Sequence, residues 1–141
     1  MYSDGIAGDN CQRGVQEADS QGNISFTTIV PGCHDGRMPH VHFGVYPGMA
    51  KAGGAANKIR ISQFIFPLAT LDQAYAASGY GASVRKLAQL NRASEMVFAD
   101  GTALQMAGAT GNAAQGYVVP PGSRRFPLNR RRGTAVEAAS H

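Results

Sequence analysis

The sequence is poor in cysteine, in charged side chains and in long apolar runs, and each shortage limits the interpretation. Two cysteines, Cys11 and Cys33, are too few to indicate a redox compartment, and they could form one disulfide or remain two buried thiols. No apolar run approaches the roughly 18 residues that a membrane span needs. The chain opens without the apolar stretch of a signal peptide, so the sequence leaves localisation open, with the cytoplasm as the default.

Charge is also scarce, at 16% of residues, and the net charge of +4 comes from one end. Residues 118–141 hold five arginines against Glu137, while residues 1–117 are neutral overall. A basic tail can bind polyanions nonspecifically, but the simpler interpretation is a solvated end. We therefore expect residues 120–141 to form a disordered tail, and we expect no specific nucleic-acid partner.

What remains is a glycine-rich chain of single-domain size, with 18 glycines among 141 residues. Runs of Val, Ile, Thr and Phe with period-two alternation, separated by turn residues, favour a mainly β domain over residues 1–119, of the β-sandwich type. Helical spacing indicates a short helical excursion around residues 70–92. The expected strands cover residues 14–19, 24–30, 39–46 and 59–66, with shorter ones near 102–108 and 113–119.

Three of the four histidines fall within nine residues. On the strand expected over residues 39–46, the period of two places His40 and His42 on one face, about 6.5–7 Å apart along the strand. Two imidazoles at that spacing can share a metal ion, although such a pair on a half-exposed strand can equally be solvated or bonded to its neighbours. His34 lies just before this strand and could fold back onto the same site.

A family resemblance adds to this pattern. Residues 26–43, F-T-T-I-V-P-G-C-H-D-G-R-M-P-H-V-H-F, resemble the iron-site segment of intradiol ring-cleavage dioxygenases, in particular the small bacterial catechol and protocatechuate branch. Four further elements occur in the family's order: R-G-V-Q at 13–16, D-S-Q-G at 19–22, S-Q at 62–63 and F-A-D-G at 98–101. The resemblance covers residues 2–117 and implies a β-sandwich of the intradiol dioxygenase core type.

The resemblance implies a non-haem ferric ion held by two tyrosinates and two histidines. His40 and His42 match the histidine ligands. Arg37 matches the active-site arginine, which would stabilise negative charge on the substrate, and Gln63 matches the glutamine that borders the substrate pocket. The implied activity is cleavage of a catechol-type aromatic by O₂ between its two hydroxyl-bearing carbons, in the catabolism of aromatic compounds.

The two tyrosine positions differ from the family pattern. His34 stands where the family has its second tyrosine, and Tyr2 is the candidate for the first, so we expect a chain shortened at its N-terminus. A site built from His34, His40 and His42 would suit Zn(II) or Fe(II) better than Fe(III). The alternative function is therefore a degraded pseudoenzyme or binding module that keeps at most a histidine metal site. An absent leading strand would expose a sheet edge, which makes a homo-oligomer an open possibility.

Overall fold

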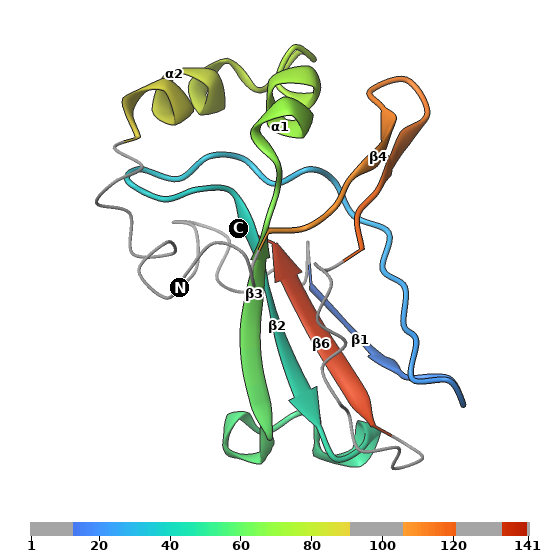
Figure 1. Ribbon diagram of the computed structural model, residues 1–141. Coiled ribbons are helices and arrows are strands. Elements are labelled where there is room, and N and C mark those ends of the chain that lie inside the picture. The colour runs from blue at the N-terminus through green and yellow to red at the C-terminus, as the bar shows by residue number, and fades with distance from the viewer. Residues whose placement is uncertain (1–12, 91–105, 121–133, 141) are drawn as a thin grey trace. The chain divides into compact units, whose positions relative to one another are not determined.

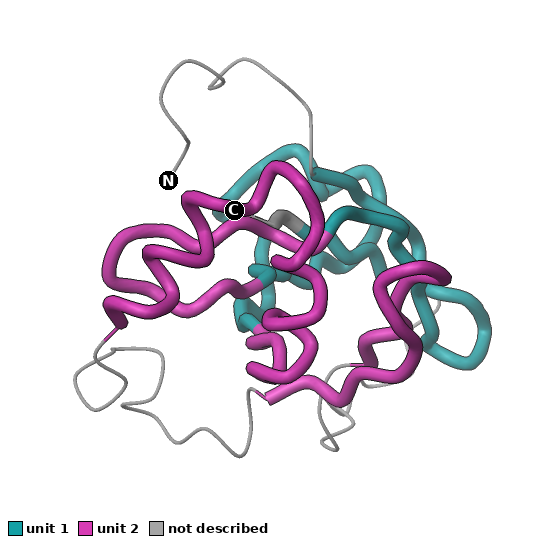
Figure 2. Tube along the Cα trace, turned by 90° about the horizontal axis from the view of Figure 1, so that it is seen from above, with its two compact units in different colours: residues 1–29, 41–63, 125–140 teal, residues 30–40, 64–124, 141 magenta. Residues whose placement is uncertain are grey.

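The computed structural model describes residues 13–90, 106–120 and 134–140, and within them the chain is mainly β with two short helices (Figure 1). The chain divides into two compact units, which Figure 2 colours separately. In the described residues, no helix combines the length and apolar character needed to cross a membrane. The sheet unit comprises residues 1–29, 41–63 and 125–140, and the helical unit comprises residues 30–40, 64–124 and 141.

A four-stranded sheet has the strand order β1-β6-β2-β3, and β6 runs antiparallel to both of its neighbours. A separate two-stranded sheet pairs β4 with β5. Strands β1, β2 and β3 confirm the strands predicted over residues 14–19, 39–46 and 59–66. The strands are β1 (Arg13–Glu17), β2 (His40–Tyr46), β3 (Arg60–Ile65), β4 (Thr110–Asn112), β5 (Gly116–Val118) and β6 (Ala135–Ser140).

Strand β6 corrects the prediction that residues 120–141 form a disordered tail. That prediction is wrong for residues 135–140, which insert between β1 and β2 as an interior strand (Figure 1). The segment Ala-Val-Glu-Ala-Ala-Ser has little intrinsic β propensity, but Val136 pairs with Gln16 on one side and with Val45 on the other. Pairing on both edges overrides local preference, which is why the sequence pattern did not indicate the strand.

Residues 24–30 also differ from expectation, because the structure assigns no strand to them despite their alternating pattern. A turn precedes them: one carboxylate oxygen of Asp19 accepts the backbone N–H groups of Gln21 and Asn23, each at 2.8 Å, and Gly22 has a φ of 82°. Beyond the turn, the ring of Phe26 lies 3.1 Å from the position that a Cβ on Gly14 would occupy. Residues 24–30 are therefore in contact with β1 through side-chain packing and not through the hydrogen bonds of a strand ladder.

The helical unit confirms the predicted excursion around residues 70–92. Buried residues on each helix, such as Leu71 and Leu87, form its apolar face. Of the strand predicted near 102–108, the structure describes residues 106–108, where Met106 forms a parallel bridge with Ile65 and the N–H of Ala107 donates to the carbonyl of Ile65 at 3.0 Å. The helices are α1 (Leu68–Ala74) and α2 (Gly81–Gln89), and the short 3₁₀ turns η1 (Met49–Lys51) and η2 (Ala55–Asn57) lie in the sheet unit.

Candidate functional site

His40, the first residue of β2, is the most deeply buried of the predicted ligands that the structure describes. It is 4% exposed, and its Nδ1 lies 2.6 Å from the carbonyl oxygen of Met38, which is itself buried. A carbonyl oxygen can only accept, so Nδ1 carries the proton and donates it to Met38. The lone pair of the ring is then on Nε2, which is the arrangement that metal-ligating histidines normally show.

His42 is the third residue of β2 and is half-buried. It pairs in register with Ala139 of β6. The period of the strand gives it the same side as His40, two residues earlier. The predicted pair of imidazoles on one strand is thus present, and β6 holds the part of β2 that carries His42.

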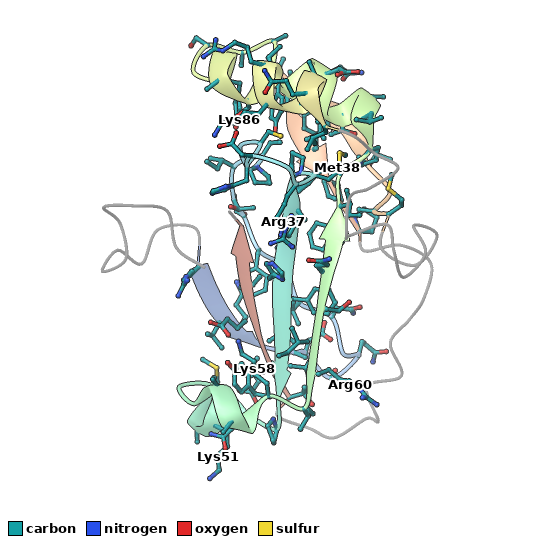
Figure 3. All side chains as sticks on the ribbon, turned by 90° about the vertical axis from the view of Figure 1, so that its left-hand side faces the viewer. Arg37, Met38, Lys51, Lys58, Arg60 and Lys86 are labelled. Carbon is teal, nitrogen blue, oxygen red and sulfur yellow. The ribbon has the colours of Figure 1, made fainter. Side chains whose placement is uncertain are left out.

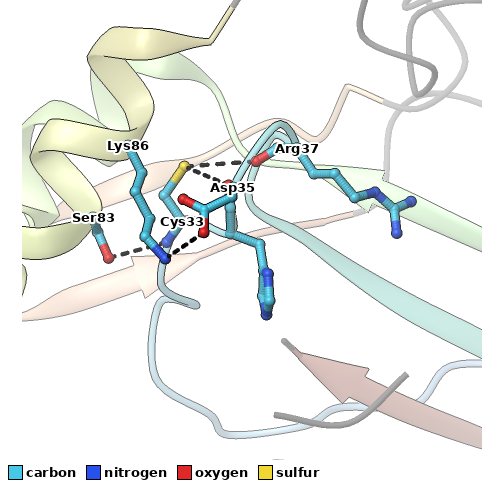
Figure 4. A network of polar contacts seen from close by, with 6 residues as sticks. Cys33, Asp35, Arg37, Ser83 and Lys86 are labelled. Atoms are coloured by element: carbon cyan, nitrogen blue, oxygen red, sulfur yellow. Dashed lines mark hydrogen bonds and ion pairs between the residues drawn. The ribbon is translucent and has the colours of Figure 1, made fainter. Parts of the chain in front are cut away.

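Arg37 closes a tight turn that begins at His34. Its backbone N–H donates to the carbonyl of His34 at 3.4 Å, and Gly36 between them has a φ of 73°, which favours glycine. The side chain is half-buried, and among the described residues its Nε is buried with no hydrogen-bond partner. A buried donor without an acceptor costs about 1–3 kcal/mol, so this guanidinium is well suited to receive an anionic ligand. In Figure 4 the side chain of Arg37 extends away from Cys33 and Asp35.

The remaining predicted residues differ from His40 in their burial. His34 is exposed, in contrast to buried His40. Gln63 lies on β3 and is half-buried, and Tyr2 lies outside the described residues. In the stretches 13–90, 106–120 and 134–140, no group of three or more His, Cys, Asp or Glu side chains is placed to hold a metal ion, so His34, His40 and His42 do not form one.

The predicted residues are divided between the two units. His34, Arg37 and His40 belong to the helical unit, while His42 and Gln63 belong to the sheet unit. For a ferric ion, the donor chemistry of β2 fits the histidine half of the ligand set, because His40 is buried and its tautomer is fixed by Met38. The tyrosine half is represented only by Tyr2, outside the described residues.

The structure adds residues that sequence reasoning missed. The hydroxyl of Tyr75 donates to the carbonyl of Pro31 at 2.8 Å, and that of Tyr80 donates to the carbonyl of Val30 at 2.6 Å. Burial raises the pKa of both hydroxyls above the usual value, so both stay protonated donors. In the sequence, Tyr80 stands between two glycines, a context that indicates a break in a helix and gives no sign of a hydrogen bond to residue 30.

Ser83 and Cys33 continue this network (Figure 4). The backbone N–H of Cys33 donates to Oγ of Ser83 at 3.0 Å. The buried thiol of Cys33 lies 3.5 Å from the carbonyl of His34 and 3.6 Å from that of Arg37, so it donates within the turn. Cys11 lies outside the described residues.

No protein-family model, curated protein or solved structure matches this chain.

Proposed function

We propose that this chain is an intradiol dioxygenase-type protein with a β-sandwich core, in which β2 provides the histidine ligands of a non-haem iron site for a catechol-type substrate and O₂. The single observation that carries the proposal is the orientation of His40. Its ring is buried and its Nδ1–H donates to Met38, so the ring orientation is set and the lone pair lies on Nε2. The family resemblance of residues 26–43 supplies the chemistry.

Each residue has a distinct role in this proposal. A ferric ion bound there would act as a Lewis acid on the catechol oxygens and make the ring itself reactive to O₂. His40 and His42 would hold the metal through their imidazole rings. Arg37 stabilises negative charge on the substrate with its guanidinium, whose buried Nε has no acceptor among the described residues. Gln63 borders the aromatic substrate.

A second function is favoured by one specific observation. His34 takes the place of a tyrosine ligand, and its side chain is exposed. Loss of an anionic phenolate removes the preference for Fe(III) and leaves imidazole donors, which suit Zn(II) or Fe(II). Under this second proposal the chain is a pseudoenzyme or binding module that retains at most a histidine metal site.

The two proposals are separated by colour and by catechol consumption. The purified full chain is loaded with Fe(III), and iron per chain, the visible spectrum and catechol loss under O₂ are measured. The first proposal predicts a tyrosinate-to-iron charge-transfer band and a ring-opened muconate-type product. Iron uptake with no visible band and with catechol left intact overturns it. Tight binding of colourless Zn(II) under the same conditions supports the second.

A further inference from the structure

Residues 30–33 are held by side chains from the helical excursion. This stretch belongs to no strand, so its backbone polar groups need other partners. Three of them are met by side-chain hydroxyls: the carbonyls of Val30 and Pro31 and the N–H of Cys33, which bond to Tyr80, Tyr75 and Ser83 respectively. We call these three hydroxyl residues the clamp.

The clamp residues are themselves well fixed. Tyr75 is 4% exposed and Ser83 is 9% exposed. The rings of Tyr75 and Tyr80 stack with their centroids 4.8 Å apart and their planes 19° from parallel. Gly32 lies between the clamped groups, and a Cβ there would come within 3.2 Å of Oγ of Ser83. The close approach therefore depends on glycine at position 32.

The clamped residues 30–33 are followed in the chain by a turn and then by the proposed metal ligand His40. The thiol of Cys33 bonds to the carbonyls of His34 and Arg37 and so closes the turn. A second tie reaches the same turn from α2, because Nζ of Lys86 lies 3.2 Å from Oδ2 of Asp35 (Figure 4). Buried Met38 and Pro39 follow, and the carbonyl of Pro39 accepts the N–H of Phe66 at 3.4 Å. His40 is the next residue.

We propose that Tyr75, Tyr80 and Ser83 are positioning residues, and that the helical excursion is the device that sets the orientation of His40 and Arg37. The inference rests on the proposed function for its purpose, since it assigns the clamp to the iron site. It goes beyond that function by assigning a role to residues 68–89, which the family resemblance does not cover by any motif. The clamp acts through the backbone of residues 30–38 and touches neither metal nor substrate.

The test uses the metal-free full chain with Tyr75→Phe and Ser83→Ala, each of which deletes one hydroxyl. Tyr117→Phe is the matched control, because its hydroxyl donates to exposed Gln73 at 3.2 Å on the surface of the same unit. Amide hydrogen exchange is measured at Cys33 and Arg37, with Ile59 as the reference amide in the sheet unit. The ¹⁵N shifts of the His40 ring are measured in parallel, since they report the tautomer.

Each clamp variant is expected to raise amide exchange at Cys33 and Arg37 about tenfold, as the loss of one net hydrogen bond predicts. Exchange at Ile59 should stay unchanged, and the His40 ring should lose its single tautomer. Tyr117→Phe should change none of these. Because Tyr75 is deeply buried, Tyr80→Phe serves as a milder second variant.

The inference is overturned if the clamp variants raise exchange equally at Ile59, which is general destabilisation, or leave the His40 tautomer unchanged. The readouts need no iron, so they separate this inference from the proposed function. Iron loading of the wild type then tests the function alone. A wild type that takes up no iron removes the dioxygenase proposal, while the exchange data still decide whether the clamp orients His40.

Discussion

The hydroxyl of Tyr46 donates a 2.8 Å hydrogen bond to Oε2 of Glu137, and so joins two residues that are 91 positions apart. The same oxygen lies 2.9 Å from Nζ of Lys58, which also lies 5.7 Å from the centre of the Tyr46 ring. Figure 3 shows Lys58 with Lys51 and Arg60 at the end of the sheet where β2 ends and β3 begins. Tyr46, Glu137 and Lys58 thus connect β6 to β2 in addition to the backbone hydrogen bonds between the two strands.

Acid should weaken this connection. Burial alone would raise the pKa of Glu137, but the hydrogen bonds from Lys58 and Tyr46 outweigh it and hold the pKa below its usual value of 4.5. Its contribution to stability is therefore present above about 4.5 and is lost as the pH falls through the folded-state pKa. We expect Glu137→Gln to flatten the acid limb of the unfolding free energy, measured by urea unfolding between pH 3 and 7. An unchanged acid limb contradicts the assignment.

The carboxylate of Glu137 also makes the unfolding free energy depend on pH in the alkaline range, where stability falls as the pH rises. Its hydrogen bond raises the pKa of Lys58 above 10.5, against a smaller opposing effect of burial. That contribution is complete below the unfolded-state value and is lost as the pH rises through the folded one. Lys58→Met should reduce stability at pH 7 and remove this alkaline loss. Lys51→Met, at an exposed position, is the control and should change neither.

Gly44 should accept a side chain only at a cost in stability while Lys58 is in place. A Cβ on Gly44 would lie 3.0 Å from both Cδ and Cε of Lys58, which the bond to Glu137 holds in position. We expect Gly44→Ala to lower the unfolding free energy by about 1–3 kcal/mol. The cost should shrink when Lys58 is replaced by Ala, which a double-mutant cycle measures. Strict additivity of the two changes contradicts the contact.

The two histidine-based proposals make opposite predictions for His34. Under the dioxygenase proposal, His40→Ala lowers iron affinity by more than about 100-fold, beyond the range that outer-shell partners alone contribute, and His34→Ala leaves it nearly unchanged. Under the histidine-site proposal, both variants lose the metal to a similar degree. Equilibrium dialysis with Fe(III) and with Zn(II) distinguishes the two results, and circular dichroism checks that each variant is folded.

Arg37 should behave as a ligand-binding residue and not as a stabilising one. Its buried Nε has no partner among the described residues, so Arg37→Met should not lower the unfolding free energy. In the iron-loaded protein the same change should reduce kcat/KM for catechol at least tenfold, with iron content unchanged. A large fall in thermal stability without any effect on catechol turnover contradicts this role.

The sequence predicted the elements whose pattern is local. The alternation of Val41, Phe43 and Val45 was enough for β2, and turn residues such as Gly22 and Asn23 were enough to separate β1 from the segment that follows. β6 could not be predicted, because its pairing partners lie far along the chain and its own residues are mostly alanine. The prediction for residues 24–30 was wrong for the opposite reason: their alternating pattern is typical of a strand, but they pair with no neighbouring strand.

As with the fold, only the local features of the candidate site could be predicted from the sequence. The spacing of His40 and His42 followed from the period of a strand, and both lie on β2. The bond between His40 and Met38 could not be foreseen, because it depends on the path of the backbone through Pro39. The hydroxyls of Tyr75 and Ser83 act on residues 44 and 50 positions away, and no spacing rule connects such pairs.

The position of β6 has a consequence for how the chain acquires its structure during synthesis. β1 and β2 are not neighbours, and the strand that joins them is made about 90 residues after β2. A nascent chain emerging from the ribosome carries both strands for that whole interval with their inner edges unpaired, and these edges are open to wrong partners. Folding of the sheet must therefore wait for translation of residues 135–140, and its rate is limited by closure of a long loop.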